Sequence, residues 1–311
     1  MNIAYLFPGQ GAQTPGFLHR LPEHRAVNAT LEEAETVLGL DVMELDTSAA
    51  LTSTVAVQLS AMIAGIAVVR ALAHEGVQVD AVAGLSVGAF GAAVACGALA
   101  FGDALPLVKL RAECMQRAYP QGYGMAAFVG LDEREIAGIV AQIGGAGAQI
   151  YIANVNAPTV IIVSGAVAAL DAAIEAARQA GARHARRLLV SVPSHCPLLA
   201  SVAQRLAVAM RPIELHAPTL PYVSNRRARV VRDAAGVRED LIYNVANTVR
   251  WYDSVSVLYE LDVRLFIEPP PGQVLSRLAQ QAFPEARAVP VEDAQLHSIV
   301  LLAEREKQSA A

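Results

Sequence analysis

The chain has 311 residues, of which 54% are hydrophobic and 17% are charged, so it can bury the core of a large domain and intrinsic disorder is excluded. Its 24 basic and 29 acidic residues give a net charge of −5, which argues against binding a nucleic-acid backbone as its main task. Three cysteines without C-x-x-C spacing predict neither a disulfide framework nor a structural zinc site.

Strands alternate with helices in the N-terminal part of the chain, which favours an α/β domain with a mainly parallel sheet. An apolar run closed by Pro8 and Gly9 predicts a buried strand that enters a glycine-rich loop. The glycines between Asp80 and Asp103 favour a strand, a turn and a buried helix over a membrane span, although this stretch is uncharged. The predicted elements are strands at 3–7 and 79–85 and helices at 54–74, 87–98 and from Asp103, as N-cap, to Tyr119.

The middle of the chain shows the β-α-β-β-α-β order of a ferredoxin-like unit. The predicted strands cover 125–130, 149–155, 159–164 and 184–190, and the predicted helices cover 132–142 and 166–180. A glycine cluster on one side and Pro193 on the other bound this unit, so we expect an inserted subdomain at 124–190. The parent domain is then discontinuous, at 1–123 and 191–311.

The C-terminal part continues the α/β pattern. It predicts a helix at 196–209. Between 258 and 279 it predicts a helix, a strand at 264–268 and a second helix, and the last residues, 304–311, are expected to form a fraying tail. The N-terminus has no charged region followed by an apolar run, so we expect no secretory signal and a cytoplasmic location.

Residues Gly84 to Gly88 form a G-x-S-x-G motif between a predicted strand and a predicted helix. In this context the glycines permit a sharp turn, with the Ser86 hydroxyl at its apex as a nucleophile. The Val87 N–H would then face the oxyanion of an attacked carbonyl group. The alternative is an ordinary serine at a tightly packed corner.

A serine nucleophile needs a base, and His195 is the best candidate among the seven histidines. It lies between a strand end and a helix start, where Pro193 and Pro197 stiffen the backbone. A structural histidine at a helix N-terminus remains the alternative. His195 also lies far from the end of the chain, an order that strains a simple α/β-hydrolase interpretation.

Arg111 lies on the next predicted helix, on the face that also carries Leu107 and Cys114. A guanidinium on an apolar face needs an anion, because an unpaired buried charge is costly. That anion is either a protein carboxylate such as Glu113 or a carboxylate of the substrate. These rules alone favour the structural ion pair.

Gln10 lies in the glycine-rich loop after the first strand, which can approach the same sheet edge as the turn at Ser86. A backbone N–H from this loop would complete an oxyanion hole. The loop lacks G-x-x-x-x-G-K, so we discount a P-loop. A basic run at 225–232 is either a solvated loop or a docking site for an acidic partner.

Six segments resemble, in the same order, the malonyl-CoA:acyl-carrier-protein transacylases of fatty-acid and polyketide synthesis. They are FPGQGAQ, GLSVG, VKLRAECMQ, IANVNAP, VSVPSHC and NTVRW, and the likeness covers nearly the whole chain. The resemblance implies an α/β-hydrolase-like domain with a ferredoxin-like insert and an S-malonyltransferase activity. It also implies malonyl-CoA as substrate, an acyl-carrier protein as acceptor and partner, and no permanently bound cofactor.

Carried over residue by residue, the resemblance assigns each candidate a role. Ser86 matches the acylated nucleophile and His195 matches its base. Arg111 matches the clamp for the malonyl carboxylate, which replaces the ion-pair interpretation. The N–H groups of Gln10 and Val87 match the oxyanion hole.

Three positions depart from the usual family pattern. Asn244 stands where a glutamine usually supplies the main-chain carbonyl that orients the histidine. Leu85 replaces the histidine of G-H-S-x-G, and Ala112 follows the arginine where glycine is usual. None of these is the nucleophile, base or clamp, so we expect activity to survive.

Leu85 and three segments of the chain look more like the epsilon subunit of bacterial malonate decarboxylase. The segments are NRRARVVR, NVANTVRWYDS and LFIEPPPGQVL. This resemblance implies transfer of malonyl to a carrier subunit whose thiol arm is a dephospho-CoA-derived prosthetic group. The alternatives are a fatty-acid-synthesis transacylase, a serine thioesterase or hydrolase that uses water as acceptor, and a non-catalytic scaffolding subunit.

Overall fold

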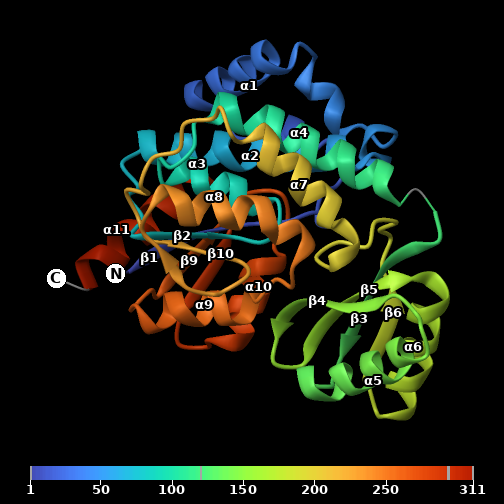
Figure 1. The fold of residues 1–311 in the computed structure, drawn as a ribbon. Helices are drawn as coiled ribbons and strands as arrows, with labels where there is room; N and C mark the ends of the chain where they lie inside the picture. The colour runs from blue at the N-terminus through green and yellow to red at the C-terminus, as the bar shows by residue number, and fades with distance from the viewer. Residues whose placement is uncertain (1, 120, 293–294, 310–311) are drawn as a thin grey trace.

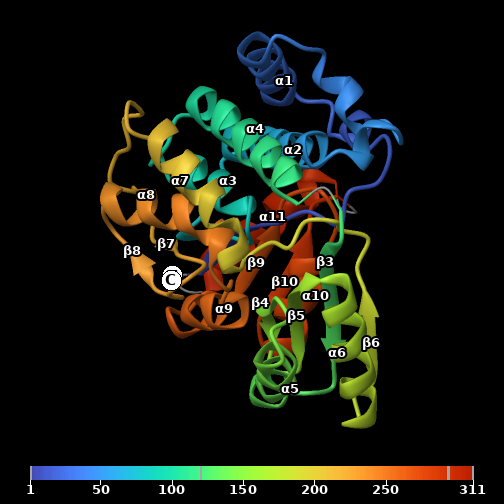
Figure 2. The same ribbon diagram turned by 45° about the vertical axis from the view of Figure 1, so that its right-hand side comes forward.

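The computed structural model describes residues 2–119, 121–292 and 295–309, which form two parts, each built on its own sheet (Figures 1 and 2). The larger part holds a six-stranded sheet in the order β10-β9-β1-β2-β7-β8. Its neighbouring strands are parallel, apart from the β7–β8 pair. These strands are β1 (Ile3–Phe7), β2 (Ala81–Gly84), β7 (Tyr222–Val223), β8 (Val230–Val231), β9 (Leu265–Glu268) and β10 (Arg287–Pro290).

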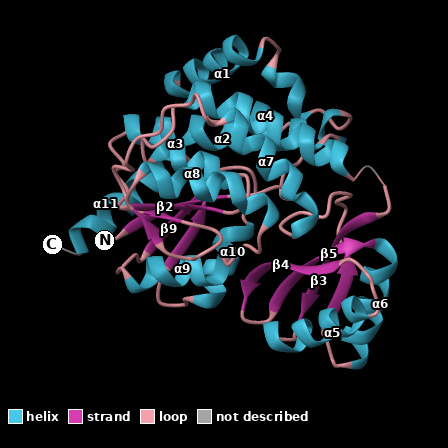
Figure 3. Ribbon diagram, in the orientation of Figure 1, coloured by secondary structure: helices cyan, strands magenta, loops and turns pink. Residues whose placement is uncertain are grey.

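The alternation of side chains along β1 explains why helices cover both faces of this sheet (Figure 3). Ile3, Tyr5 and Phe7 pack into the core under one helical layer, whereas Ala4 and Leu6 pack against α9 and α10. The helices of the larger part are α1 (Arg25–Leu38), α2 (Thr54–His74), α3 (Gly88–Ala95), α4 (Phe101–Ala118), α7 (Ala200–Ala209), α8 (Ala234–Tyr243), α9 (Trp251–Glu260), α10 (Val274–Ala282) and α11 (Leu296–Ser309).

Helix α2 runs through the centre of the first helical layer. Among the described residues it is the one helix long and apolar enough to cross a membrane, but 89% of its most apolar window is buried inside the protein. Gln58 and Ser60 are the polar residues among its buried positions. The stretch between Asp80 and Asp103 forms the predicted strand, turn and helix.

The smaller part is a four-stranded antiparallel sheet in the order β4-β5-β3-β6, with α5 and α6 on one face (Figure 1). Its elements are β3 (Tyr123–Val129), α5 (Glu133–Gly145), β4 (Ile150–Ala157), β5 (Val160–Ala166), α6 (Val167–Gln179) and β6 (His184–Arg187). Main-chain hydrogen bonds tie β4 to the larger part, since Val155 N donates to Val249 O at 2.9 Å and Val249 N donates to Ala153 O at 2.8 Å.

The predicted fold class is confirmed, including the β-α-β-β-α-β order of the smaller part. The proposed domain boundaries at 124 and 190 stay a prediction. Two local predictions are wrong. Asp103 lies in the first turn of α4, whose N-cap is Ala100. The expected tail at 304–311 is helical as far as Ser309, because Ile299 and Ala303 pack into the core; residues 310–311 lie outside the described residues.

Two glycines of the G-x-S-x-G motif allow the backbone to pack closely around Ser86. A Cβ added to Gly84 would lie 2.0 Å from Gly88 O, and one added to Gly88 would lie 2.2 Å from Phe7 O. Both neighbours are main-chain atoms that cannot move independently. The glycines are therefore required by close approach of β1, β2 and α3.

Replacing Gly88 with alanine should lower the free energy of unfolding by about 1–3 kcal/mol, because the added methyl group overpacks the junction. The matched control is Gly138→Ala in the exposed part of α5, where a Cβ meets nothing within 4 Å. That change should raise stability by up to about 1 kcal/mol. Urea unfolding of both variants tests this, and equal effects would contradict the packing argument.

Candidate active site

Ser86 occupies the sharp turn between β2 and α3. Its φ is +59°, in the left-handed region that non-glycine residues rarely adopt. Ser86 is buried, yet it borders a partly open cavity. The motif thus forms the turn that the sequence predicted, and the strained conformation is of the kind found at functional sites.

His195 lies against the Ser86 hydroxyl, although the two residues come from distant parts of the chain. Its Nε2 lies 2.8 Å from Ser86 Oγ, and its Nδ1 lies 2.7 Å from the main-chain oxygen of Asn244. A carbonyl oxygen only accepts hydrogen bonds, so Nδ1 carries the proton. Nε2 is left with the lone pair that can take the proton of Ser86.

The environment of His195 keeps its ring neutral. Burial, and then the nearby charge of Arg111, lower the pKa of His195 from 6.5 to about 4. His195 also has a φ of +61°, so both members of the pair adopt left-handed backbone conformations. A neutral imidazole with a free Nε2 lone pair can act as a general base at pH 7.

Arg111 is fully buried on α4, and its guanidinium reaches the same hydroxyl. Nη2 lies 3.1 Å from Ser86 Oγ, and Nη1 donates to Gln58 Oε1 at 2.7 Å. Among the described residues no carboxylate lies within ion-pairing distance of Arg111, and Glu113 pairs with Arg117 instead. The structural ion pair favoured by the burial rules alone is therefore wrong.

The charge of Arg111 persists despite this burial. Burial lowers the pKa of Arg111 to about 9, which leaves the guanidinium protonated at pH 7. Its Nε is buried without a hydrogen-bond partner among the described residues. An unbalanced buried cation with a free N–H is arranged to receive an anion next to Ser86.

Gln58 is a site residue that the sequence analysis missed. Its side chain links Arg111 to Gln10, because Nε2 donates to Gln10 Oε1 at 3.3 Å. A polar residue at a buried position of the very apolar helix α2 was the signal that could have found it.

The loop that carries Gln10 lies against the turn at Ser86. A Cβ added to Gly9 would lie 3.0 Å from Leu85 O and 3.6 Å from Ser86 Cβ. Among the described residues, the backbone N–H groups of Gln10 and Val87 have no hydrogen-bond partner. Both donors remain available to an oxyanion formed at Ser86.

A cavity of about 130 Å³ joins these groups, with Gln10, Ser86 and His195 in its wall. The smaller sheet contributes the opposite wall. Two residues of the wall, Asn156 and Ser194, each have a buried side-chain oxygen without a hydrogen-bond partner among the described residues. The remaining lining residues are Leu85, Met125, Asn154, Ile162, Leu188 and Val190. Unsatisfied donors and acceptors around a small cavity indicate a site for a polar ligand.

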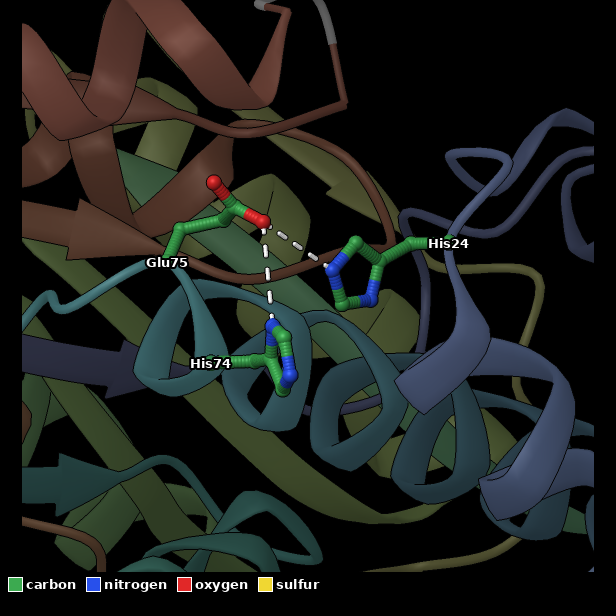
Figure 4. Close-up of side chains that lie close together, drawn as sticks. All are labelled: His24, His74 and Glu75. Carbon is green, nitrogen blue, oxygen red and sulfur yellow. Dashed lines mark hydrogen bonds and ion pairs between the residues drawn. The ribbon is translucent and has the colours of Figure 1, made fainter.

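The cluster of His24, His74 and Glu75 has the residue types of a metal site, but the ring nitrogens that face Glu75 are hydrogen-bond donors and not free ligands (Figure 4). Glu75 Oε1 lies 3.2 Å from His24 Nε2 and 3.8 Å from His74 Nδ1. The other nitrogen of each ring accepts a hydrogen bond, from Ala26 N–H in His24 and from the Arg25 guanidinium in His74. The neutral rings therefore present N–H groups to Glu75, whereas a metal needs lone pairs there. We assign this cluster a structural role, joining α1 to the end of α2.

Comparisons with known proteins agree over almost the full length of the chain. The acyl transferase domain family matches residues 4–309. The malonyl CoA-acyl carrier protein transacylase of Haemophilus influenzae is 34% identical, covering 94% of this chain and 96% of that protein.

Solved structures show the same similarity in three dimensions. An acyl-carrier-protein S-malonyltransferase from Burkholderia pseudomallei is 35% identical, with a TM-score of 0.92 over 97% of this chain and all of that one. A malonyl-transacylase in complex with its type II PKS acyl-carrier protein is 32% identical, with a TM-score of 0.91 over 97% and 99% of the two chains.

The lowered pKa of His195 predicts how the reactivity of Ser86 depends on pH. Phosphonylation of Ser86 by a fluorophosphonate, followed by mass spectrometry, should proceed at a constant rate from neutral pH down to about pH 5 and lose half its rate near the pKa of about 4. Ser86→Ala is the unlabelled control. Loss of half the rate near pH 6.5 would contradict a buried neutral base.

The same lowered pKa predicts how stability depends on pH. Between pH 6.5 and about 4, His195 binds a proton in the unfolded chain but not in the folded protein, so the free energy of unfolding should fall as pH falls through this range.

Proposed function

The chain belongs to the acyl transferase family, and we propose that it moves a malonyl group from malonyl-CoA, through an ester on Ser86, to the thiol of an acyl-carrier protein. The observation that carries this proposal is the buried Arg111 guanidinium, which lies 3.1 Å from Ser86 Oγ and has no carboxylate partner in the part of the chain that the structure describes. A malonyl group has a free carboxylate that supplies the missing negative charge. The names of the similar enzymes support the same substrate.

In the first half-reaction His195 Nε2 takes the proton of Ser86 while Oγ attacks the thioester carbonyl carbon. The N–H groups of Gln10 and Val87 stabilise the oxyanion of the tetrahedral intermediate. The C–S bond then breaks, and the CoA sulfur receives the proton from His195. Malonyl-serine remains, with its carboxylate bound to Arg111.

In the second half-reaction the carrier thiol gives its proton to His195 and its sulfur attacks the ester carbonyl carbon. The intermediate collapses, Ser86 Oγ leaves and takes the proton back. The reaction needs no permanently bound cofactor, because malonyl-CoA is a substrate and the thiol arm belongs to the carrier.

The acidity of the two acceptors favours a thiol over water. A free thiol has a pKa of about 8.5 and water about 15.7, so any one base, His195 included, deprotonates the thiol far more readily. This difference supports transfer over a thioesterase or hydrolase activity and does not depend on the lowered pKa of His195.

An acyl-carrier protein is the better supported acceptor, since a similar enzyme was solved with such a carrier. The carrier subunit of malonate decarboxylase is a second candidate. Leu85 favours it, because this leucine lines the cavity beside Ser86 where most family members carry histidine. A cytoplasmic location belongs to the same proposal, and the free thiols of Cys96, Cys114 and Cys196 suit a reducing compartment.

Replacing Arg111 with alanine should reduce malonyl transfer relative to acetyl transfer by about 10- to 100-fold, the effect of losing one charge-assisted hydrogen-bonded contact. The ratio of kcat/KM for malonyl-CoA and acetyl-CoA measures this. Arg117→Ala is the matched control on the same helix, because Arg117 is exposed and pairs with Glu113. An unchanged ratio in Arg111→Ala would exclude the clamp.

Incubation with malonyl-CoA should add a malonyl group to Ser86 that persists in water and disappears when a carrier thiol is added. Mass spectrometry of the intact protein follows the adduct, with an acyl-carrier protein and a decarboxylase carrier subunit as parallel acceptors. Faster discharge by one carrier identifies the preferred acceptor. Rapid loss in water alone would indicate a hydrolase, and equal activity of the assembled complex with Ser86→Ala would indicate a scaffolding subunit.

A further inference from the structure

Asn225, which directly follows the short strand β7 and Ser224, contacts the backbone on both sides of Leu85. Its Oδ1 accepts the Ser86 N–H at 2.9 Å, and its Nδ2 donates to Gly84 O at 2.8 Å. An amide N–H only donates and a carbonyl oxygen only accepts, so these partners set the orientation of the Asn225 amide. One side chain therefore holds the two peptide groups that enter and leave Leu85.

Asp240, on α8, holds Asn225 in turn. The buried carboxylate accepts from Asn225 N at 3.0 Å, from Asn225 Nδ2 at 3.4 Å and from the Tyr222 hydroxyl at 2.7 Å. The backbone N–H of Arg226 adds a longer contact at 3.4 Å. These donors balance a carboxylate that would otherwise be costly to bury, so Asn225 has little freedom to turn.

The position of the Ser86 hydroxyl depends on this turn. Ser86 has a left-handed backbone, which surrounding contacts must maintain. Its Oγ must stay within hydrogen-bond distance of both His195 and Arg111. A small rotation of the peptide before Ser86 would move Oγ away from Nε2, and misplacement of about 1 Å can cost about 100-fold in rate.

We propose that Asn225, held by Asp240, is a positioning residue that keeps the nucleophilic hydroxyl of Ser86 aligned with His195. The inference rests on the proposed function only in taking Ser86 as the nucleophile.

The inference also gives Asn225, the first residue of the basic run at 225–232, a role other than docking. Arg226 and Arg227 of that run share the carboxylate of Glu239, so one of their two positive charges is balanced locally.

The test measures phosphonylation of Ser86 by a fluorophosphonate, in which the O–P bond forms, the P–F bond breaks and His195 takes the proton. Asn225→Ala should react about 100-fold more slowly than the unmodified protein at the same folded fraction. In the transfer assay kcat should fall with little change in KM for malonyl-CoA, because Arg111 is untouched. The matched control is Asp233→Ala, which removes the N-cap of α8 without contacting the turn and should react normally.

Asn225→Asp provides a second variant whose result a purely structural role would not produce. The introduced carboxylate accepts from Ser86 N–H but repels Gly84 O and Asp240, whereas its protonated form can donate to Gly84 O. Labelling of this variant should therefore be slow at pH 8 and recover as pH falls toward 5.5, a range in which His195 stays neutral.

Labelling of Asn225→Ala at the normal rate, or slowing equal to that of Asp233→Ala, would overturn the positioning role. So would a flat pH profile for Asn225→Asp. Failure of the unmodified protein to label would overturn the assignment of Ser86 and this inference with it. Normal labelling without malonyl transfer would instead reject the proposed function and leave the positioning role intact.

Discussion

The proposed chemistry depends on a positive charge, that of Arg111, which is buried beside the Ser86 hydroxyl without a carboxylate partner among the described residues. Burying an ion costs several kcal/mol, and the hydrogen bond from Arg111 to Gln58 offsets only part of that cost. The proposed function rests on the remaining imbalance, because the carboxylate of an anionic acyl group on Ser86 would supply the missing charge. The same charge also lowers the pKa of His195, so in the proposed function one guanidinium acts on both substrate choice and base strength.

Backbone geometry supplies the second constraint. Ser86 and His195 both adopt positive φ angles, and glycines at 84 and 88 allow the main chain to close around the serine. The histidine is oriented by a carbonyl oxygen of the chain and not by an acidic side chain. This hydrogen bond sets the tautomer of His195 and by itself raises the pKa of the ring, but burial and the charge of Arg111 lower that pKa by more.

The departures from the usual family pattern are understandable from these contacts. Asn244 orients His195 through its main-chain oxygen, which any residue can supply, and its side-chain Nδ2 donates to Ser86 O at 3.3 Å. Leu85 points its side chain toward Gly9 and the cavity, so it changes the wall and leaves the reacting groups in place. Ala112 is fully buried next to Arg111 and adds only a methyl group to the core.

Periodicity and turn chemistry are local in sequence, so the chain by itself determined the alternation of strands and helices, the ferredoxin-like order and the turn at Ser86. The same local signals left α1 and α8 without a prediction and made polar α11 look like a tail, because only packing against α2 and the core reveals its buried face. Resemblance to a family named six candidate residues, but Gln58, Asn225 and Asp240 carry no local signal of comparable strength. Their contacts join residues 53 and 139 positions apart, for Arg111–Gln58 and Ser86–Asn225. Hydrogen bonds across such separations exist only after the sheet and its helices have packed, so the tertiary structure alone decided that Arg111 has no carboxylate partner among the described residues and which side chain contacts the turn at Ser86.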